Sequence, residues 1–556
     1  MPRLRADRRP RRCTLAVITR LALALAIGLI AFLPRELQAQ ASSRRVYSLQ
    51  VDLRYAEAVA EVVQTVHYRN SAGVPLDRIV FQVTPAYYGA FLSLDASADG
   101  VPLESNLDGT VLDVPLAAPL DAGETVTLRL QYRLDVPRQL GRFGAGPRAL
   151  ALGNWFPILA PHRGDWFRGQ YVEIGDAFFT EVADFEVHLT TDVPLQVAHS
   201  GEVLDHDDAL TWRLGASSLR DFALVVSPEF VHTRETLGAV AIDSFAFDSL
   251  AAERAAVAAK RYLEWYGETL GGYPYPELDV VALDLPSSYG GMEYPALVMM
   301  EASTPLPDPP DGSYAEYLLA HEIAHQWFYS RVGNDQVHDP WLDESLATYL
   351  PLLYDRIQRP DQFPSAWSAR IAGGYADRVQ AAGDLPADSG IHDFSAEGPY
   401  NTIVYRKGAH YLGSLNDRLG DDAMVSLLRE YVTTFQDKIA TPRAFLDLAQ
   451  RRTADNLNPL GADHFSYGML TYPTPQSWSL DVPSGSLDGT VSISVAAEFP
   501  IDRLEILLDS QVLYDGTSVT PLVDLNEVPA GEYLLLVRLT NSEGALFERA
   551  LRVRVA

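Results

Sequence analysis

Hydrophobic and polar side chains alternate along several stretches of the chain between residues 44 and 240. Alternation with a period of two residues is typical of β-strands that bury one face. Clusters of Gly, Asp and Pro separate these stretches, as turns between strands would. The pattern predicts a β-sheet domain over residues 44–240, with its clearest strands at Tyr47–Leu53, Glu61–Tyr68, Thr125–Leu134 and Phe185–Leu189.

From about residue 241 the hydrophobic positions recur with the spacing of an α-helix. Ala251–Leu270 is an alanine-rich amphipathic stretch, whereas Leu278–Leu285 has the continuous apolar character of a buried strand. The pattern predicts a mainly helical domain over residues 241–462. Its further helices are expected at Asp361–Ala381, Ala409–Leu419, Asp421–Phe435 and Pro442–Arg452.

The end of the chain alternates again, after a segment rich in prolines and aromatic residues at 463–476 that we interpret as a linker. Short apolar stretches separated by turn residues predict a small β-sandwich of immunoglobulin-like type over residues 477–556. The only cysteine of the chain is Cys13, so this sandwich would lack an inter-sheet disulfide. The strands are expected at Leu480–Val482, Val491–Ala496, Leu504–Leu508, Tyr533–Leu539 and Ala550–Val555.

Residues 1–41 have the composition of an export signal. A basic start is followed by the apolar run Leu21–Leu33 and by the small-residue pattern Ala39-Gln40-Ala41, which is typical of a cleavage site. The run is shorter than the roughly 20 residues of a membrane-spanning helix, although an uncleaved anchor is the alternative. We therefore expect a protein that is secreted, periplasmic or held in the cell envelope.

The charge of the chain bears on its partners. The formal net charge is −29, with 47% hydrophobic and 21% charged residues, the balance of an ordinary globular protein. A strongly acidic surface repels phosphate groups, so we expect neither nucleic acid nor an anionic membrane surface as a partner. The oligomeric state does not follow from the sequence.

The pattern with the most specific chemistry is His321-Glu322-Ile323-Ala324-His325, followed eighteen residues later by Glu344. On a helix, residues four apart lie on one face, so both histidines can reach a single ion. A third ligand from a neighbouring segment leaves one position open for water, as in catalytic zinc sites. Glu322 would then lie beside the metal, where it can take a proton from the attacking water.

Two helix-start signals surround these residues. Ser313 followed by Glu316 forms a capping box, so a helix should begin just before the histidines. Asp339-Pro340-Trp341 predicts a second helix with Asp339 as N-cap and proline at its first position. Glu344 would lie in the first turns of this second helix. The sequence therefore predicts two helices that present His321, His325 and Glu344 to one ion.

The segments HEIAHQWF and WLDESLA resemble those of the aminopeptidase N-type gluzincins, zinc peptidases whose pattern is HExxH, eighteen residues and Glu. Upstream, Tyr289–Tyr294 resembles the Gly-x-Met-Glu-Asn motif of that family, with Tyr294 at the usual Asn position. Downstream, Tyr405–Gly408 resembles its Tyr-Glu-Lys-Gly motif. The resemblance implies a multidomain α+β fold with an N-terminal β-saddle and a thermolysin-like, mainly helical catalytic domain.

The resemblance also implies roles for residues outside the HExxH pattern. Glu293 would bind the free ammonium of a peptide, while Gly290, Gly291 and Met292 would lie along the bound substrate. Tyr405 would donate a hydrogen bond to the oxyanion of the transition state. A glutamine that helps to hold the substrate amine in many relatives has no recognisable counterpart here, and Ala151–Pro157 stands roughly where it is expected.

Other polar residues near these motifs are weaker candidates. Asp343 and Thr348 could orient the metal ligands, and Tyr400 could lie near the substrate. We interpret His338 and His410 as structural or surface residues.

Together these features predict an aminopeptidase with one Zn²⁺ per chain that removes the first residue from peptides with a free N-terminus. Glu322 and Tyr405 would be the catalytic residues. An endopeptidase on the same scaffold remains an alternative, as does the epoxide-hydrolysing branch of the family, which uses the same metal site. A catalytically inactive extracellular binding protein is an alternative from a different class.

Overall fold

The computed structural model describes residues 45–286, 290–304, 306–307, 312–453, 455–466, 478–483, 485–497, 500–508, 511–526, 528–541 and 546–556. The chain divides into two compact units, the second of which contains residues 386–388, 410–431 and 442–556. The predicted export segment 1–41 and residues 467–476 of the predicted linker lie outside the described residues. No helix within the described ranges is both long enough and apolar enough to span a membrane.

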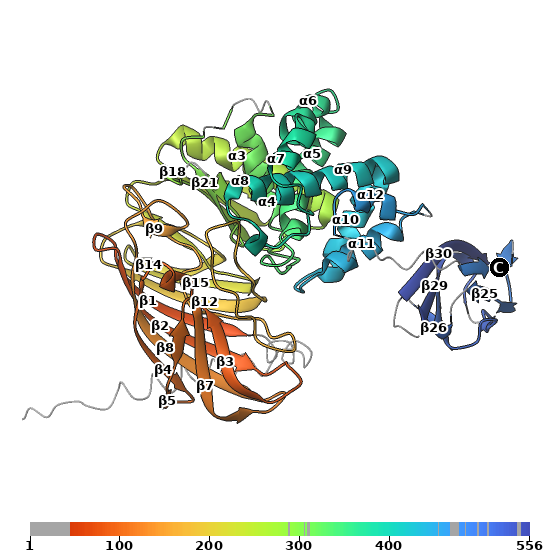
Figure 1. The fold of residues 1–556 in the computed structure, drawn as a ribbon, viewed down its shortest axis with the longest axis horizontal. Coiled ribbons are helices and arrows are strands. Elements are labelled where there is room, and N and C mark those ends of the chain that lie inside the picture. Colours follow the sequence, from red (N-terminus) through yellow and green to blue (C-terminus); the bar gives the residue numbers. More distant parts are fainter. Residues whose placement is uncertain are drawn as a thin grey trace, which may run out of the picture. The chain divides into compact units, whose positions relative to one another are not determined.

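The N-terminal part of the chain is β-rich (Figure 1). Its largest sheet has eight strands, and the two longest, Val59–Arg69 and Thr125–Asp135, bury alternate side chains. All four strands predicted from the alternating pattern are present in this sheet and extend slightly beyond the predicted limits. In spatial order the sheet contains β14 (Glu202–Asp208), β15 (Thr211–Leu219), β12 (Ala183–Thr191), β1 (Val46–Arg54), β2 (Val59–Arg69), β8 (Thr125–Asp135), β4 (Phe91–Ala98) and β5 (Val101–Leu103).

Two four-stranded sheets complete this β-rich part. Side chains from all three sheets share one hydrophobic core, which includes Leu49, Val80, Leu130 and Trp155. The first small sheet contains β13 (Gln196–His199), β16 (Leu224–Ser227), β10 (Leu150–Leu152) and β9 (Phe143–Ala145). The second contains β11 (Ile158–Leu159), β3 (Leu76–Gln82), β7 (Val111–Leu120) and β6 (Asn106–Asp108).

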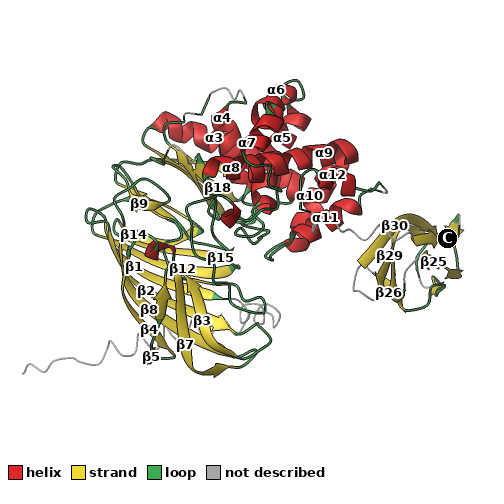
Figure 2. Ribbon diagram, viewed as in Figure 1, coloured by secondary structure: helices red, strands yellow, loops and turns green. Residues whose placement is uncertain are grey.

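A five-stranded sheet follows, and helices gather beside it (Figure 2). Its strand order is β17 (Val231–Leu237), β18 (Val240–Ala246), β19 (Glu277–Leu283), β21 (Leu297–Glu301) and β20 (Gly291–Met292). β17 and β18 form a hairpin, so the sheet begins before residue 241. The first two helices of this region are α3 (Ser249–Leu270), which packs on β17 and β18, and α4 (Tyr314–Ala324).

Helix α5 (Trp341–Gln358) begins at Trp341, with Pro340 at the N-cap position. The predicted start at Pro340 is therefore wrong by one residue. The predicted helix Asp361–Ala381 is also wrong as a single element, since Gly374 adopts a left-handed conformation (φ 64°) that interrupts it. The structure has instead α6 (Phe363–Trp367), a π-helical turn (Ser368–Ala372) and α7 (Tyr375–Ala381).

Three of the remaining helices agree closely with the predicted ones. They are α9 (Gly408–Leu419), α10 (Asp421–Phe435) and α11 (Pro442–Gln450). Three further elements were not predicted, namely α8 (Glu397–Tyr400), a second π-helical turn (Asn401–Lys407) that leads from α8 into α9, and the short α12 (Asn458–Ala462).

The β-rich part and the helical part of the first unit are joined by a buried arginine. Arg220 follows β15 and is only 1% exposed. Its guanidinium donates to the carbonyl oxygens of Thr180 (3.0 Å), Tyr329 (2.7 Å), Ser330 (3.1 Å) and Lys438 (2.8 Å). These four carbonyls satisfy a charge that would otherwise be costly to bury.

The end of the chain forms strands with a hydrophobic core of their own, which includes Leu504, Ile506 and Val537. One sheet contains β23 (Ser486–Leu487), β30 (Leu546–Val555), β29 (Gly531–Asn541), β26 (Ile501–Leu508) and β27 (Gln511–Gly516). Two strand pairs accompany it, β22 (Trp478–Asp481) with β25 (Ser494–Ala497), and β24 (Thr490–Ser492) with β28 (Leu522–Asp524).

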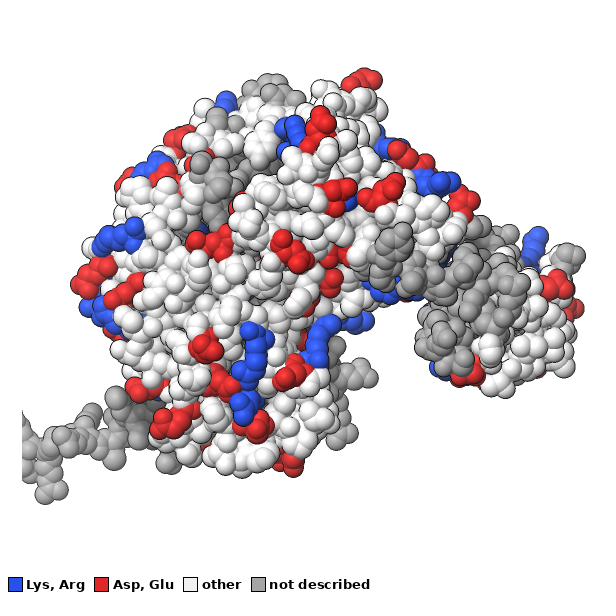
Figure 3. All heavy atoms as spheres, in the orientation of Figure 1, with Lys and Arg blue, Asp and Glu red and all other residues white. Residues whose placement is uncertain are grey.

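Acidic side chains do not gather into one patch on the face shown in Figure 3. Asp and Glu are spread over it, with Arg and Lys between them. The negative charge of the chain is thus distributed over this face rather than concentrated at one site.

Candidate metal centre

The two histidines of the HExxH pattern lie at the C-terminal end of α4. The helix begins as predicted, because Ser313 is its N-cap and the Ser313 Oγ accepts the backbone N–H of Glu316 (3.3 Å). His325 is the C-cap residue, one turn beyond His321. Both rings are buried, and their Nε2 atoms lie 3.1 Å apart.

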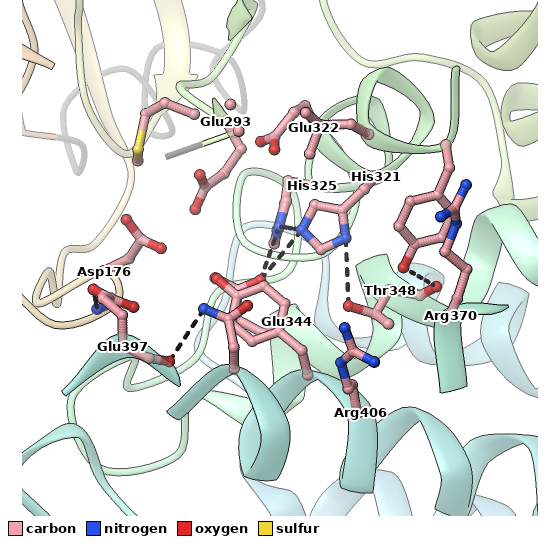
Figure 4. A pocket seen from close by; sticks show the side chains of 18 of the residues that line it. Asp176, Glu293, His321, Glu322, His325, Glu344, Thr348, Arg370, Glu397 and Arg406 are labelled. Atoms are coloured by element: carbon pink, nitrogen blue, oxygen red, sulfur yellow. Dashed lines mark hydrogen bonds and ion pairs between the residues drawn. The ribbon is translucent and has the colours of Figure 1, made fainter. Parts of the chain in front are cut away.

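Glu344 reaches the same point from the first turn of α5. Its Oε2 lies 3.4 Å from the Nε2 of His321 and 3.3 Å from the Nε2 of His325. Figure 4 shows these three side chains converging from two helices. Two imidazole nitrogens and a carboxylate oxygen, buried and within 4.8 Å of one another, are a donor set that fits Zn²⁺.

Burial and mutual charge shift the pKa values of the three donors in different directions. Burial lowers the pKa of His321, which favours the neutral imidazole that a metal requires. Burial also raises the pKa of Glu344, but His325 and His321 outweigh that effect and hold the pKa below its usual range, so the carboxylate is ionised. Burial acts to lower the pKa of His325 too, but Glu344 and Glu322 outweigh that effect and raise this pKa to about 9, so a metal ion that binds here must displace a proton from this ring.

Neighbouring residues fix the two rings. The Nδ1 of His325 lies 3.0 Å from the carbonyl oxygen of Phe328, so the neutral ring donates from Nδ1 and offers the lone pair of Nε2 to a metal. The Nδ1 of His321 lies 3.4 Å from the Oγ1 of Thr348. Asp343 accepts hydrogen bonds from Asn334 (2.9 Å) and Gln336 (2.6 Å), which hold it beside Glu344.

Glu322 lines the same cavity and is only 4% exposed. Burial, together with the neighbouring Glu293, raises its pKa well above the usual range of a glutamate. Such a carboxyl accepts a proton more readily than an exposed one, which a general base requires.

The predicted substrate-binding residues surround Glu322. Gly290, Gly291, Met292 and Glu293 all line the cavity, and Gly291–Met292 pairs as a short strand with Met299–Met300 of β21. Glu293 is 3% exposed, and its Oε1 has no hydrogen-bond partner among the described residues. The first residue of the motif, Tyr289, lies outside the described residues.

Tyr294, at the position where relatives have asparagine, is fully buried and takes part in a contact with the β-rich part. Its hydroxyl donates to the Oδ1 of Asn154 (2.5 Å). Asn154 belongs to the stretch Ala151–Pro157, where a glutamine of the family was expected. This stretch therefore contacts the side chain that follows Glu293.

Sequence reasoning missed three charged residues of this region. Asp176 comes from the segment between β11 and β12, and one of its oxygens lies within 4.8 Å of ligand atoms of Glu293 and Glu344. Arg142 forms an ion pair with Asp176 and donates to the carbonyl oxygen of Gly175 (2.9 Å). Glu397 lines the cavity and accepts the N–H of Gly175 (2.9 Å). No motif marks these positions, and only the tertiary fold brings Asp176 and Glu397 to the cavity and Arg142 to Asp176.

Tyr405 lies in the π-helical turn Asn401–Lys407 and faces the metal donors. Its ring centroid is 5.7 Å from that of His321, with the two planes nearly parallel. Burial, together with Glu344 and Tyr400, raises the pKa of Tyr405 well above its usual value, so the phenol keeps its proton and can donate it. Tyr400 is fully buried, with its ring centroid 5.7 Å from that of Tyr405.

Contacts behind Tyr405 hold the turn in place. The Oγ of Ser345 donates to the carbonyl oxygen of Val404 (2.7 Å), and the Nζ of Lys407 donates to Asp384 (2.8 Å) and to the carbonyl of Leu385 (2.9 Å). A Cβ on Gly408 would lie 1.8 Å from the Oγ of Ser345. In the Tyr-x-Lys-Gly motif, Lys407 thus anchors the turn, and Gly408 allows it to lie close to Ser345 of α5.

The two other histidines near the motifs lie in different surroundings. His338 is exposed and its Nδ1 lies 2.9 Å from Asp335. The Nδ1 of His410 lies 3.0 Å from the Nε2 of His464. Neither side chain lines the cavity.

The cavity has room for a small ligand, with about 170 Å³ open to water-sized molecules. It brings together all nine residues predicted for the site. They are His321, Glu322, His325, Glu344, Tyr405, Gly290, Gly291, Met292 and Glu293.

Comparison with known proteins agrees with this geometry. Residues 254–465 match the model of the peptidase family M1 domain. This region is a peptidase family M1 domain. It contains both ligand-bearing helices and the turn that carries Tyr405.

The chain is similar in sequence to aminopeptidases and to a leukotriene A-4 hydrolase. Endoplasmic reticulum aminopeptidase 2 of Bos taurus is 29% identical over 173 residues, 29% of this chain and 18% of that protein. Aminopeptidase N of Rattus norvegicus is 30% identical over 179 residues, 30% of this chain and 18% of that protein. Leukotriene A-4 hydrolase of Xenopus laevis is 27% identical over 185 residues, 32% of this chain and 29% of that protein. The matched region thus spans less than a third of each relative.

Solved structures share the fold over a larger part of the chain. An M1 zinc metallopeptidase from Deinococcus radiodurans superposes with a TM-score of 0.53 at 23% identity, covering 76% of this chain and 91% of that one. A mutant of it, bound to a Tyr-Ser-Ala substrate, gives a TM-score of 0.54 at 21% identity, covering 76% of this chain and 92% of that one. The arrangement of a β-rich part before a helical part is therefore that of M1 peptidases.

Proposed function

We propose that this protein is a zinc-dependent aminopeptidase that hydrolyses the bond after the first residue of a peptide. One observation supports this most directly. The buried donors of His321, His325 and Glu344 lie in the same cavity as Glu293, a carboxylate whose Oε1 has no partner among the described residues. A metal ion held by these donors would lie at the scissile bond, and the carboxylate of Glu293 would lie at the N-terminus of the peptide. Peptides with a free ammonium group are the substrates that suit this pair.

The chemistry divides among the residues as follows. Zn²⁺ held by His321, His325 and Glu344 would polarise the scissile carbonyl and acidify the attacking water. Glu322 takes the proton of that water as general base, and later gives it to the departing amine as general acid. The hydroxyl of Tyr405 donates a hydrogen bond to the carbonyl oxygen as negative charge develops on it.

Binding of the substrate fixes where the cut falls. Glu293 pairs with the α-ammonium, while the backbone at Gly290 and Gly291 is open to an extended peptide. A peptide held at its ammonium presents its first peptide bond to the metal donors. This distinguishes the proposal from an endopeptidase, which would need no free N-terminus.

The test is hydrolysis of matched aminoacyl amides with free and N-acetylated amino groups, with zinc, with a chelator, and with the Glu322→Gln variant as the blank. Activity confined to the free amines and absent from the blank supports an aminopeptidase. Cleavage of both series indicates an endopeptidase. If a sample that holds one zinc per chain cuts neither series, the proposal is wrong and a binding protein becomes the better hypothesis.

We also propose the finer assignments of architecture and location. The large twisted sheet suits a β-saddle, and the two ligand-bearing helices suit a thermolysin-like domain. The strands of residues 478–556 suit an immunoglobulin-like sandwich. The basic and apolar composition of residues 1–41 supports export, to be tested by fractionating cells and sequencing the N-terminus of the mature protein.

A further inference from the structure

The cavity carries opposite charges on its two sides. In Figure 4, Asp176, Glu293 and Glu397 lie on one side of the three metal donors, and Arg370 and Arg406 lie on the other. The acidic side is where the proposed function places the ammonium of the peptide. The basic side has no role in that function, so it calls for a separate explanation.

The two arginines have no acidic partner among the described residues. Neither Arg370 nor Arg406 forms an ion pair with a described carboxylate, and the Nη1 of Arg406 is buried without a hydrogen-bond partner among the described residues. Other arginines of this region do have an acidic partner, such as Arg359 with Glu316 (2.7 Å). An unpaired guanidinium beside a cavity is unexpected in a chain whose net charge is −29.

The surroundings hold the two guanidinium groups at the cavity without neutralising them. Arg370 lies over the rings of Tyr314 and Tyr317, with its Cζ 5.0 and 5.1 Å from their centroids. Burial and the nearby charges of Arg378 and Arg370 lower the pKa of Arg406. A bound anion would relieve both the repulsion and the missing hydrogen bond.

The two arginines lie next to residues of the proposed reaction. Arg406 directly follows Tyr405, and Arg370 lies in the π-helical turn Ser368–Ala372. A peptide whose ammonium is bound by Glu293 extends past the metal donors toward this side of the cavity. The groups that reach the arginines are therefore those C-terminal to the bond that is cut.

We propose that Arg370 and Arg406 bind a carboxylate of the substrate on the C-terminal side of the scissile bond. This inference rests on the proposed aminopeptidase function and adds a substrate class to it, peptides with an anionic group shortly after the first residue. The carboxylate can be the C-terminus of a short peptide or the side chain of Asp or Glu. Guanidinium groups bind carboxylates through short, charge-assisted hydrogen bonds in either case.

The experiment compares kcat/KM for two matched series of substrates that share the first residue preferred by the enzyme. One series contains di-, tri- and tetrapeptides of alanine after that residue, each as the free acid and as the C-terminal amide. The other contains amidated tripeptides with Glu or Gln as the second residue. The first series tests the C-terminal carboxylate, and the second tests a side-chain carboxylate.

For wild type we expect kcat/KM to favour the anionic member of at least one pair by about 10- to 100-fold, the range for a hydrogen bond to a charged group. In Arg370→Gln, Arg406→Gln and the double variant this ratio should fall toward one. Because each ratio compares two substrates within one variant, a general loss of activity cancels. Arg129→Gln, an exposed arginine of β8, should keep the wild-type ratio.

Two outcomes would overturn the inference while leaving the aminopeptidase function intact. One is equal cleavage of the acid and amide members in both series by wild type. The other is a preference for the anionic member that persists in the double variant. If wild type cuts no member of either series, nor the free aminoacyl amides, it is the proposed function itself that fails.

Discussion

Gly291 lies directly against the carboxylate of Glu322, since a Cβ on residue 291 would be 2.5 Å from Oε1 and 2.6 Å from Cγ. A glycine at 291 therefore leaves the space that the carboxylate of Glu322, the proposed general base, occupies. Any larger side chain at 291 must displace Glu322 from the position at which it meets water.

Gly291→Ala should therefore lower kcat about 10²-fold or more, because a displaced base loses most of its contribution to proton transfer. The bound zinc should remain at one per chain, since the ligands on α4 and α5 are untouched. Gly272→Ala is the matched control, as a Cβ there meets no atom within 4 Å. Equal activity of the two variants would contradict the close contact.

Loss of a metal ligand should be separable from loss of the base. Glu344→Gln should weaken zinc binding by more than about 100-fold, the upper range for residues that only support a ligand. Glu322→Gln should keep its zinc and lose activity. Metal content measured by mass spectrometry after dialysis distinguishes the two, and zinc retained by Glu344→Gln would exclude Glu344 as a ligand.

Tyr405→Phe removes the proposed donor to the oxyanion without changing the shape of the ring. We expect kcat to fall by about 10²- to 10³-fold with little change in KM, because the hydrogen bond strengthens only as charge develops. Tyr400→Phe, at the neighbouring ring, should have a much smaller effect. A large rise in KM with unchanged kcat would mean that Tyr405 binds the substrate instead.

Gly408 supports the turn that carries Tyr405, because its lack of a side chain leaves room for the Oγ of Ser345. Gly408→Ala forces a Cβ onto the Oγ of Ser345, so the free energy of unfolding should fall by about 1–3 kcal/mol, the usual cost of overpacking. Activity should fall as well, since the turn that carries Tyr405 must move. Gly398→Ala is the control, since its Cβ would meet nothing within 4 Å. It should change neither the free energy of unfolding, measured by urea denaturation, nor the activity, measured by kinetic assays.

The stability of the protein should depend on pH through Asp221. Burial raises its pKa to about 7 from an ordinary value of 3.8, although hydrogen bonds from Phe222 and Asn154 oppose the shift. The folded state thus holds a proton that the unfolded state releases. The resulting stabilisation is complete below about pH 4 and is lost as the pH rises through about 7.

We therefore expect the free energy of unfolding, measured in urea between pH 5 and pH 8, to contain a contribution that falls by at most about 1.4 kcal/mol per pH unit. Asp221→Asn should lack this contribution. Asp95→Asn, an exposed residue of β4, should retain it. Parallel pH profiles for wild type and Asp221→Asn would show that Asp221 is ionised throughout.

The sequence was sufficient to predict structural features that depend on neighbouring residues along the chain. The alternation around Thr125 and the capping serine at 313 gave strands and a helix start that the structure confirms, because their causes are local. Asp176 and Arg142 could not be found in this way. They belong to irregular segments of the β-rich part, and only folding brings them beside Glu293 and Glu344.

The break at Gly374 was missed for a related reason. The apolar spacing of residues 361–381 suits a helix throughout, but the glycine at 374 adopts a conformation that a helix excludes. Similarly, the π-helical turn at Asn401–Lys407 has no signature in the spacing of its residues. The turn is held by residues distant in sequence, since Lys407 contacts Asp384 and Leu385, and Val404 accepts a hydrogen bond from Ser345.

The burial of Arg220 means that the catalytic part cannot be treated as a separable module. Cutting the chain after residue 230 would leave three carbonyls of the helical part, those of Tyr329, Ser330 and Lys438, without their donor. Each unpaired buried group costs about 1–3 kcal/mol, a large share of the stability of a typical domain. The two parts should therefore unfold in a single cooperative transition, and an isolated helical fragment should be recovered mainly as aggregate.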